Sequence, residues 1–229
     1  MIELQNILFI DIETVPIFPN YQELPEDWQK LWDKKAKYLT QENETPSDIY
    51  ERAGIYAEFG KIICISAGII TSKQEIRIKS FYGDNEKEIL NNFAELLNRY
   101  YKTDEHYLAA HNGKEFDYPY IARRMLVNKI SLPKLLDIAG KKPWEVKHID
   151  TLELWKFGDY KHYTSLELLA KLFEIPTPKD DINGADVAKV YYQEKNIERI
   201  VKYCEKDVIT LIKLYLRQKN IDFETFSWK

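Results

Sequence analysis

Three apolar segments in the first third of the chain are typical of β-strands. Ile7-Leu8-Phe9-Ile10 is a short continuous apolar run, as expected for a central strand that is buried on both faces. Ile62 to Ile70 is a second apolar run, and Ile76 to Phe81 alternates between apolar and polar residues. With a turn at Thr71 to Gln74, these segments predict a meander of three strands.

The rest of the chain alternates helical and strand patterns. Its helical segments repeat apolar residues every three to four positions, and one of them opens with Thr164-x-x-Glu167, the spacing of a capping box. Helices are expected at 86–101, 116–129, 164–173, 185–192 and 197–218, and further strands at 107–111 and 146–149. We therefore expect one α/β domain over residues 1–229, with a mixed sheet flanked by helices.

Residues 18–57 interrupt this pattern directly after the first strand. Trp28, Leu31, Trp32 and Leu39 follow a helical stripe within this polar and aromatic stretch. Exposed Trp rings can stack nucleic-acid bases, but packing is the usual role of such residues on an amphipathic helix. We expect an inserted helical segment that lines or covers the entrance to a site beside the first strand.

The formal net charge of −4 limits how the chain could contact nucleic acid. A protein that binds long nucleic acid over its whole surface is normally basic, so any such contact should be local. Cys64 and Cys204 lie in apolar segments, which indicates reduced core cysteines in a cytoplasmic protein. The longest apolar run is too short to cross a bilayer, and the N-terminus lacks the pattern of a signal peptide, so we expect no membrane association.

Two acidic residues follow the first apolar strand without a break. Side chains alternate across a strand, so Asp11 and Glu13 should point to the same face. Two like charges at the end of a buried strand are costly unless a cation lies between them, and carboxylate oxygens suit Mg²⁺ or Mn²⁺. The alternative is a strand end whose acids face water, and the Asp-x-Glu motif alone favours that alternative.

The last predicted helix places an acid on its apolar side. Asp207 lies three residues after Cys204 and four before Leu211, within the apolar stripe of this helix. Tyr203 lies four residues before Asp207, so the two side chains should project together. The pair is compatible with a functional site and equally with a buried hydrogen bond that supports the fold.

A third segment, His111-Asn112-Gly113-Lys114-Glu115-Phe116-Asp117, leaves a strand and enters a helix. Asp117 alone would be assigned as the N-cap of that helix, because it precedes Tyr118-Pro119. Together, however, the three segments supply four acids from strand ends and helices. Such a set can hold two divalent ions about 4 Å apart for phosphoryl displacement.

This combination resembles the DEDD (DnaQ-like) exonuclease superfamily, which has the RNase H-like fold. Phe9-Ile10-Asp11-Ile12-Glu13-Thr14 resembles its first motif, His111-Asn112-Gly113 with Phe116-Asp117 the second, and Tyr203-x-x-x-Asp207 the third in the Tyr subtype. Within that subtype the chain is most similar to stand-alone bacterial proteins related to the exonuclease domain of family-B DNA polymerases. The resemblance also includes Phe59-Gly60-Lys61-Ile62 and Lys179-Asp180-Asp181-Ile182-Asn183-Gly184.

The resemblance implies a 3′→5′ exonuclease that uses two divalent cations, Mg²⁺ or Mn²⁺, and releases nucleoside monophosphates from single-stranded DNA 3′ ends. Asp11, Glu13, Asp117 and Asp207 would be the metal ligands, and Tyr203 would orient the attacking water. Thr14, Asn112 and Phe116 are expected to contact substrate. An exoribonuclease of the RNase D type and a catalytically inactive nucleic-acid-binding module are the alternatives.

Further polar residues have simpler expected roles. Asp150 precedes Thr151 and has Glu153 three residues on, so it should cap a helix rather than bind metal. A basic cluster is the best candidate for a phosphate track, although a solvated face would show the same pattern. Its members are Lys141, Lys142, Lys147, His148, Lys156, Lys161 and His162.

Overall fold

A six-stranded mixed sheet forms the centre of the protein, described by a computed structural model over residues 2–159, 161, 163–176 and 182–228. Its strand order is β5-β4-β1-β2-β3-β6, in which β1 to β3 are antiparallel and β4, β5 and β6 run parallel to their neighbours. The strands are β1 (Ile7–Pro16), β2 (Gly60–Ile70), β3 (Glu75–Tyr82), β4 (Tyr107–Ala110), β5 (Ile149–Asp150) and β6 (Ser227–Trp228). The expected α/β class with a mixed sheet is confirmed.

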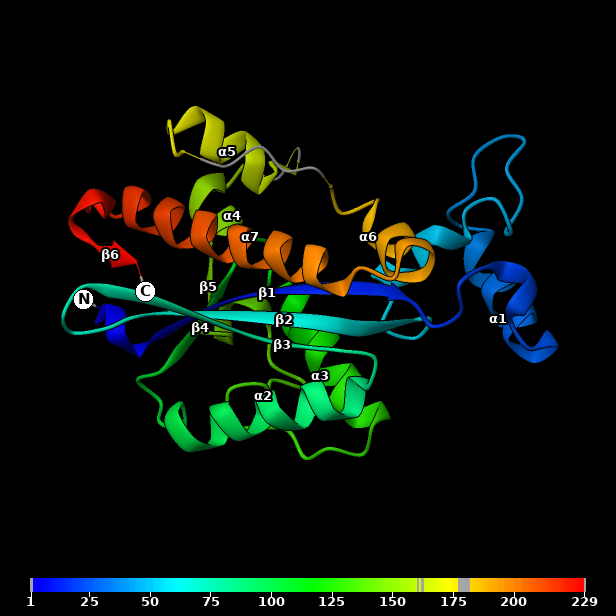
Figure 1. Cartoon of the computed structure of the whole chain (residues 1–229), viewed down its shortest axis with the longest axis horizontal. Coiled ribbons are helices and arrows are strands. Elements are labelled where there is room, and N and C mark those ends of the chain that lie inside the picture. Colours follow the sequence, from blue (N-terminus) through cyan, green and yellow to red (C-terminus); the bar gives the residue numbers. More distant parts are fainter. Residues whose placement is uncertain (1, 160, 162, 177–181, 229) are drawn as a thin grey trace.

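Helices cover both faces of the sheet (Figure 1). The long helix α7 lies along one face, and α4 and α5 contact it on the same side of the sheet. Helices α2 and α3 lie on the opposite face. Apolar side chains fill the interfaces between the helices and the sheet, so the sheet is buried on both sides. The helices are α1 (Glu26–Ala36), α2 (Glu86–Tyr100), α3 (Asp117–Val127), α4 (Thr151–Lys156), α5 (Leu166–Leu172), α6 (Val187–Lys189) and α7 (Ile197–Gln218).

Several boundaries differ from the sequence-based expectation. Ser165, not Thr164, caps α5: its hydroxyl accepts the Leu168 N–H at 3.2 Å. The helix expected at 185–192 is a short α6 that continues as a π-helical turn, Val190–Glu194. The strand expected at 146–149 is only Ile149–Asp150, and the chain's C-terminal segment adds the unexpected strand β6 beside β3. No helix within the described residues is long and apolar enough to cross a membrane.

Residues 18–57 leave the end of β1 and form α1 with the 3₁₀ turns η2 (Tyr21–Glu23) and η3 (Tyr50–Ile55). They have a small core of their own around Trp32, which is fully buried and donates its indole N–H to the Pro46 carbonyl at 2.8 Å. Trp32 is therefore a packing residue and cannot stack a base. Leu31 is half-exposed, so it does not belong to the buried stripe.

A buried ion pair ties the returning end of this segment to the helices. Arg124 on α3 makes a two-pronged contact with Glu86 at 2.8 and 2.6 Å and also donates to the Ala57 carbonyl at 2.9 Å. Glu86 additionally accepts the Ile62 backbone N–H on β2 at 2.8 Å. Because both charges are buried, each depends on the other, and α2, α3 and β2 are held in one arrangement. That arrangement places the first turn of α3 next to β1.

Candidate active site

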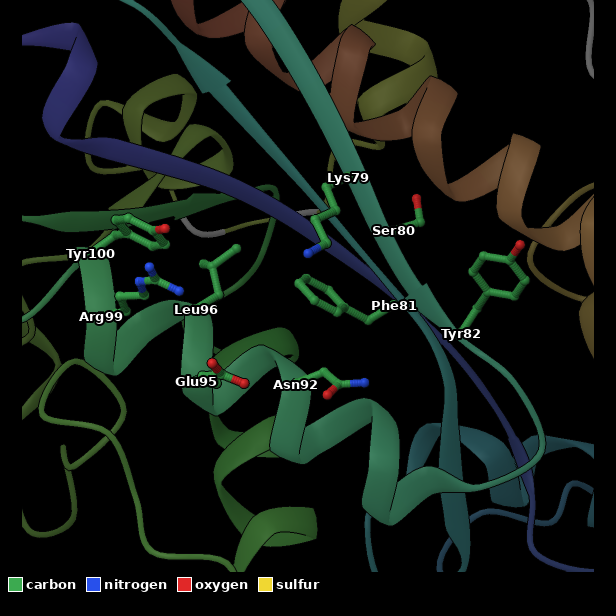
Figure 2. A pocket seen from close by; sticks show the side chains of 9 residues that line it. All are labelled: Lys79, Ser80, Phe81, Tyr82, Asn92, Glu95, Leu96, Arg99 and Tyr100. Carbon is green, nitrogen blue, oxygen red and sulfur yellow. The ribbon is translucent and has the colours of Figure 1, made fainter.

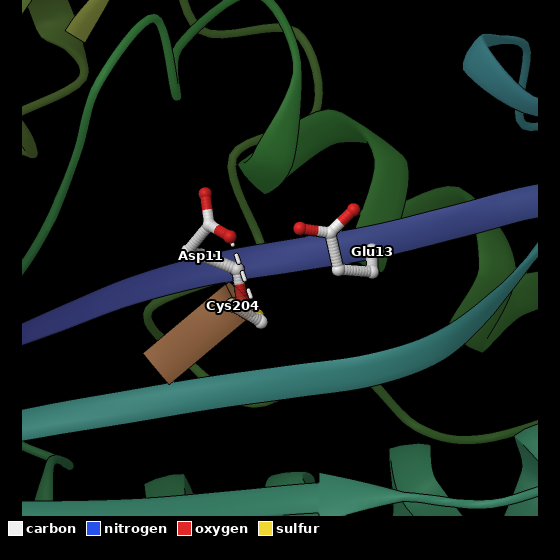
Figure 3. A group of neighbouring side chains, drawn as sticks. All are labelled: Asp11, Glu13 and Cys204. Atoms are coloured by element: carbon white, nitrogen blue, oxygen red, sulfur yellow. Dashed lines mark hydrogen bonds between the residues drawn. The ribbon is translucent and has the colours of Figure 1, made fainter. Parts of the chain in front are cut away.

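The central strand β1 carries the first two predicted site residues past the end of its neighbour. β4 pairs only with Ile7 to Phe9, which leaves one edge of β1 open from Ile10 onward, while Asp11 and Glu13 keep partners on β2. Asp11 is half-buried and Glu13 is buried. Their carboxylates lie on the same side of β1 (Figure 3), as the alternation of side chains predicts. The register between β1 and β2 shifts directly after Glu13, where β2 carries one extra residue, Ile63.

Asp117 reaches the same place from the opposite face of the sheet. It is the first residue of α3, is only 3% exposed, and accepts a hydrogen bond from the backbone N–H of Ile12 on β1. Phe116 occupies the N-cap position and no side chain caps the helix, so the capping role considered for Asp117 is wrong. Burial, with a contribution from the charge of Asp150, raises the pKa of Asp117 to about 8.

Helix α7 supplies Tyr203 and Asp207, which project together as expected. The Tyr203 hydroxyl donates a hydrogen bond to the Asp207 carboxylate. Partial burial raises the pKa of Tyr203 far above its usual value, and the charges of Asp207, Glu13 and Asp11 raise it further. Tyr203 therefore stays protonated at any physiological pH.

Asp117 and Asp207 both lie near enough to Asp11 and Glu13 for their charges to act on them. Burial is the main cause of the raised pKa values of Asp11 and Glu13, and the charges of Asp207 and Asp117 add to it for both. Four such carboxylates cannot all ionise cheaply in one partly buried place unless cations offset them. Their oxygens are the hard ligands that Mg²⁺ and Mn²⁺ prefer, so the residues present fit a pair of divalent ions.

The family model for a "predicted 3'-5' exonuclease related to the exonuclease domain of PolB" matches residues 55–225, which is most of the chain. The chain belongs to this family. The matched range includes Asp117, Tyr203 and Asp207, whereas Asp11 and Glu13 lie before it. Only the fold places those two acids beside the matched residues.

Two curated relatives of this exonuclease-family chain are DNA polymerases. It is 23% identical over 194 residues to a DNA polymerase of Pyrococcus glycovorans, covering 76% of the chain and 24% of the polymerase. It is also 23% identical over 203 residues to a DNA polymerase of Pyrococcus horikoshii, covering 75% of the chain and 16% of that polymerase. The chain thus spans a quarter or less of the length of these curated relatives.

A solved structure supports the fold of this family member. The family B DNA polymerase from Pyrobaculum calidifontis aligns with a TM-score of 0.55 at 12% identity, over 92% of this chain and 24% of the polymerase chain. At this identity the match shows the fold alone, and it confirms the RNase H-like architecture.

Cys204 is a neighbour of the site that the sequence interpretation assigned only to the core. Its Sγ lies 3.2 Å from Oδ2 of Asp11 and 3.4 Å from the Asp11 carbonyl oxygen (Figure 3). Burial raises the pKa of the Cys204 thiol well above its usual value, so the thiol is protonated and donates to the carboxylate. The spacing of three residues to Asp207 was the available signal, because it places both on one side of α7.

Asp150 organises the loop that precedes Asp117. As predicted, it caps α4, accepting the N–H groups of Leu152 at 3.0 Å and Glu153 at 3.4 Å. Its carboxylate also accepts the N–H groups of Asn112 at 2.9 Å and Lys114 at 3.1 Å. One buried side chain thus joins two segments beside the acid cluster.

The residues expected to contact substrate lie on the segments that carry Glu13 and Asp117. Thr14 follows Glu13 on β1, and its hydroxyl donates to the Tyr120 oxygen. Asn112 has a left-handed backbone with φ of 62°, in the loop fixed by Asp150. Phe116 is partly buried against the core and packs beside Tyr120 with ring centroids 5.4 Å apart. Contact between these residues and substrate stays a prediction.

One residue of the proposed basic track, His148, lies in the core. His148 is buried, accepts the Leu108 N–H at Nδ1 and donates from Nε2 to the Leu135 carbonyl, so it cannot line a phosphate track. His162 and Lys179 to Asp181 lie outside the described residues.

A cavity of about 480 Å³ lies elsewhere, between β3 and α2 (Figure 2). Its lining includes Lys79, Phe81, Arg99 and Tyr100 but none of the predicted site residues. The candidate active site is therefore the acid cluster at the open edge of β1, separate from this cavity.

Proposed function

We propose that this protein is a metal-dependent 3′→5′ exonuclease that hydrolyses terminal phosphodiester bonds of single-stranded DNA and releases nucleoside monophosphates. The observation that carries the proposal is that Asp117 and Asp207, from two helices, both lie within electrostatic reach of Asp11 and Glu13 on β1. Their segments are far apart in the sequence. Gathering four acids in a partly buried place costs free energy unless a cation offsets their charges.

The four carboxylates would hold two divalent ions, Mg²⁺ or Mn²⁺. When bound, such ions activate the attacking water and stabilise charge on the phosphate and on the leaving oxygen. The carboxylates of Asp11 and Glu13 lie side by side on β1 and would hold the ions together with Asp117 from α3 and Asp207 from α7.

Tyr203 would orient the attacking water. Its hydroxyl proton takes part in the hydrogen bond to Asp207, so the phenol oxygen keeps lone pairs that can accept a hydrogen bond from water. A phenol with a raised pKa is a poor general base near neutrality, so Tyr203 acts by positioning rather than by removing a proton.

The substrate assignment rests on the relatives and on charge. DNA polymerases are the relatives by sequence, which favours DNA over RNA. The net charge of −4 favours a short, local contact with a frayed or single-stranded 3′ end over tight binding along a duplex. We also propose that residues 18–57 are an insertion in a single domain and border the substrate entrance. Their last turn is tied to α3 by the Tyr120 hydroxyl, which donates to the Gly54 carbonyl at 2.7 Å.

The test uses single-stranded DNA and RNA of one sequence, labelled at the 5′ end, with Mg²⁺ or with chelator. The proposal expects stepwise shortening of the DNA, with nucleoside monophosphates as products, and no shortening in chelator. Full activity in chelator would contradict the two-ion site. Preferential shortening of RNA would support the exoribonuclease alternative, and binding without shortening would support the inactive module.

A further inference from the structure

An exposed aromatic ring lies at the edge of the acid cluster. Tyr163, in the segment between α4 and α5, is 61% exposed. Partial burial raises the pKa of Tyr163, and the charges of Asp117, Asp11, Asp150 and Asp207 raise it further, so the ring lies within electrostatic reach of these acids. A large ring that is left uncovered beside a proposed catalytic site is available to a ligand.

The ring of Tyr163 packs beside His111. The imidazole of His111 meets it edge-on, with ring centroids 6.1 Å apart at 70°. His111 lies 2.8 Å from the carbonyl oxygen of Thr164 through Nε2 and 2.9 Å from the Thr151 hydroxyl through Nδ1. A carbonyl only accepts, so Nε2 carries the proton, and burial lowers the pKa of His111 and keeps the ring neutral. The chain next to Tyr163 is thereby fixed to the segment that leads to Asp117.

We propose that Tyr163 stacks on the base of the 3′-terminal nucleotide, a contact that rests on the proposed exonuclease function of the adjacent acids. Stacking on an aromatic ring accepts every base, which suits an enzyme that must remove each nucleotide in turn. It also supplies affinity that does not depend on phosphate contacts, as an acidic protein requires. In this arrangement His111 acts as the support for the ring of Tyr163.

The experiment is a double-mutant cycle on binding affinity, which combines removal of the Tyr163 ring with removal of the terminal base. Fluorescence anisotropy in chelator measures binding of single-stranded DNA that ends in a normal nucleotide or in an abasic one. The variants are Tyr163→Ala, which removes the ring, and Tyr163→Phe, which keeps it. Tyr100→Ala is the control, since Tyr100 is a similarly exposed ring on α2, across the sheet.

Tyr163→Ala is expected to weaken binding of the normal DNA about 10-fold and to leave binding of the abasic DNA within about 2-fold. Tyr163→Phe and Tyr100→Ala should bind both like the unaltered protein. An equal loss on both DNAs, or no loss, would overturn the stacking proposal. Hydrolysis by the unaltered protein with Mg²⁺ is measured separately, so a failure of the exonuclease function is distinguishable from a failure of stacking.

Discussion

The sulfur of Cys204 lies 3.2 Å from Oδ2 of Asp11, which joins helix α7 to the proposed metal site by a thiol–carboxylate hydrogen bond. Residues that hydrogen-bond a metal ligand fix its orientation, and their loss commonly costs 10- to 100-fold in metal affinity. A thiol is a weak donor, so we expect the lower end of that range. Cys204→Val should weaken Mg²⁺ binding about 10-fold, whereas Cys204→Ser, which keeps a donor, should stay within about 3-fold of the unaltered protein.

Val208→Ala controls for packing losses, because Val208 is fully buried one turn further along α7 and packs within the apolar core. Calorimetric titration with Mg²⁺ measures the metal affinity of the three variants. Equal metal affinity in Cys204→Val and Cys204→Ser would show that the thiol only fills space.

The stability of the metal-free protein should fall as the pH rises. The pKa of Asp117 is raised to about 8 in the folded protein, against about 3.9 when unfolded. Its stabilising contribution is full below the unfolded value and is lost as the pH rises through about 8. In chelator, the melting temperature of the unaltered protein should therefore drop between pH 6 and pH 9. The melting temperature of Asp117→Asn should drop less over the same range. Mg²⁺ should raise melting more at pH 9 than at pH 6; the same Mg²⁺ effect at both would contradict this assignment.

Asp150 should contribute more to stability than an ordinary helix cap. Its buried carboxylate accepts N–H groups from both the 112–114 loop and the start of α4. Asp150→Ala should lower the free energy of unfolding by about 2–4 kcal/mol. Asn85→Ala, which removes the exposed cap of α2, should cost about 1 kcal/mol. Urea denaturation measures both, and equal costs would mean that the loop contacts of Asp150 contribute nothing.

Hydrophobic periodicity was enough to predict the main elements of this fold. The apolar run at Ile7 is buried throughout, and the apolar stripe of the last helix coincides with its buried residues, so their patterns are unambiguous. Short elements were harder: β5 has only two residues, and β6 forms only because β3 offers it an edge. Pairing of that kind depends on tertiary contacts that no local pattern contains.

The candidate site was predictable as a set of residues but not as a geometry. The motifs marked Asp11 and Asp207, whereas local rules alone assigned Asp117 to capping. The hydrogen bond from Ile12 to Asp117 and the thiol beside Asp11 are contacts between segments distant in sequence. Tyr163 escaped notice because nothing in its neighbourhood distinguishes it from other tyrosines in a loop.

Tyr203 and Asp207 share one side of α7, but their substitutions should affect turnover and metal affinity differently. Tyr203→Phe keeps the ring and removes the hydroxyl, so turnover should fall roughly 100-fold or more through loss of water positioning. Asp207→Asn removes a charged ligand, so turnover and metal affinity should fall together. Turnover on single-stranded DNA with saturating Mg²⁺ measures the first effect, and unaltered turnover in Tyr203→Phe would leave the pair as a structural hydrogen bond.

Calorimetric titration with Mn²⁺ tests the two-ion site most directly. The unaltered protein and Tyr203→Phe should each bind two ions, because all four carboxylates remain in both. Asp207→Asn should bind more weakly or lose one ion, and its metal-free form should melt no lower than the unaltered protein because repulsion among the acids is relieved. Absence of Mn²⁺ binding to the unaltered protein, or unchanged binding to Asp207→Asn, would contradict the assignment of these acids as a metal site.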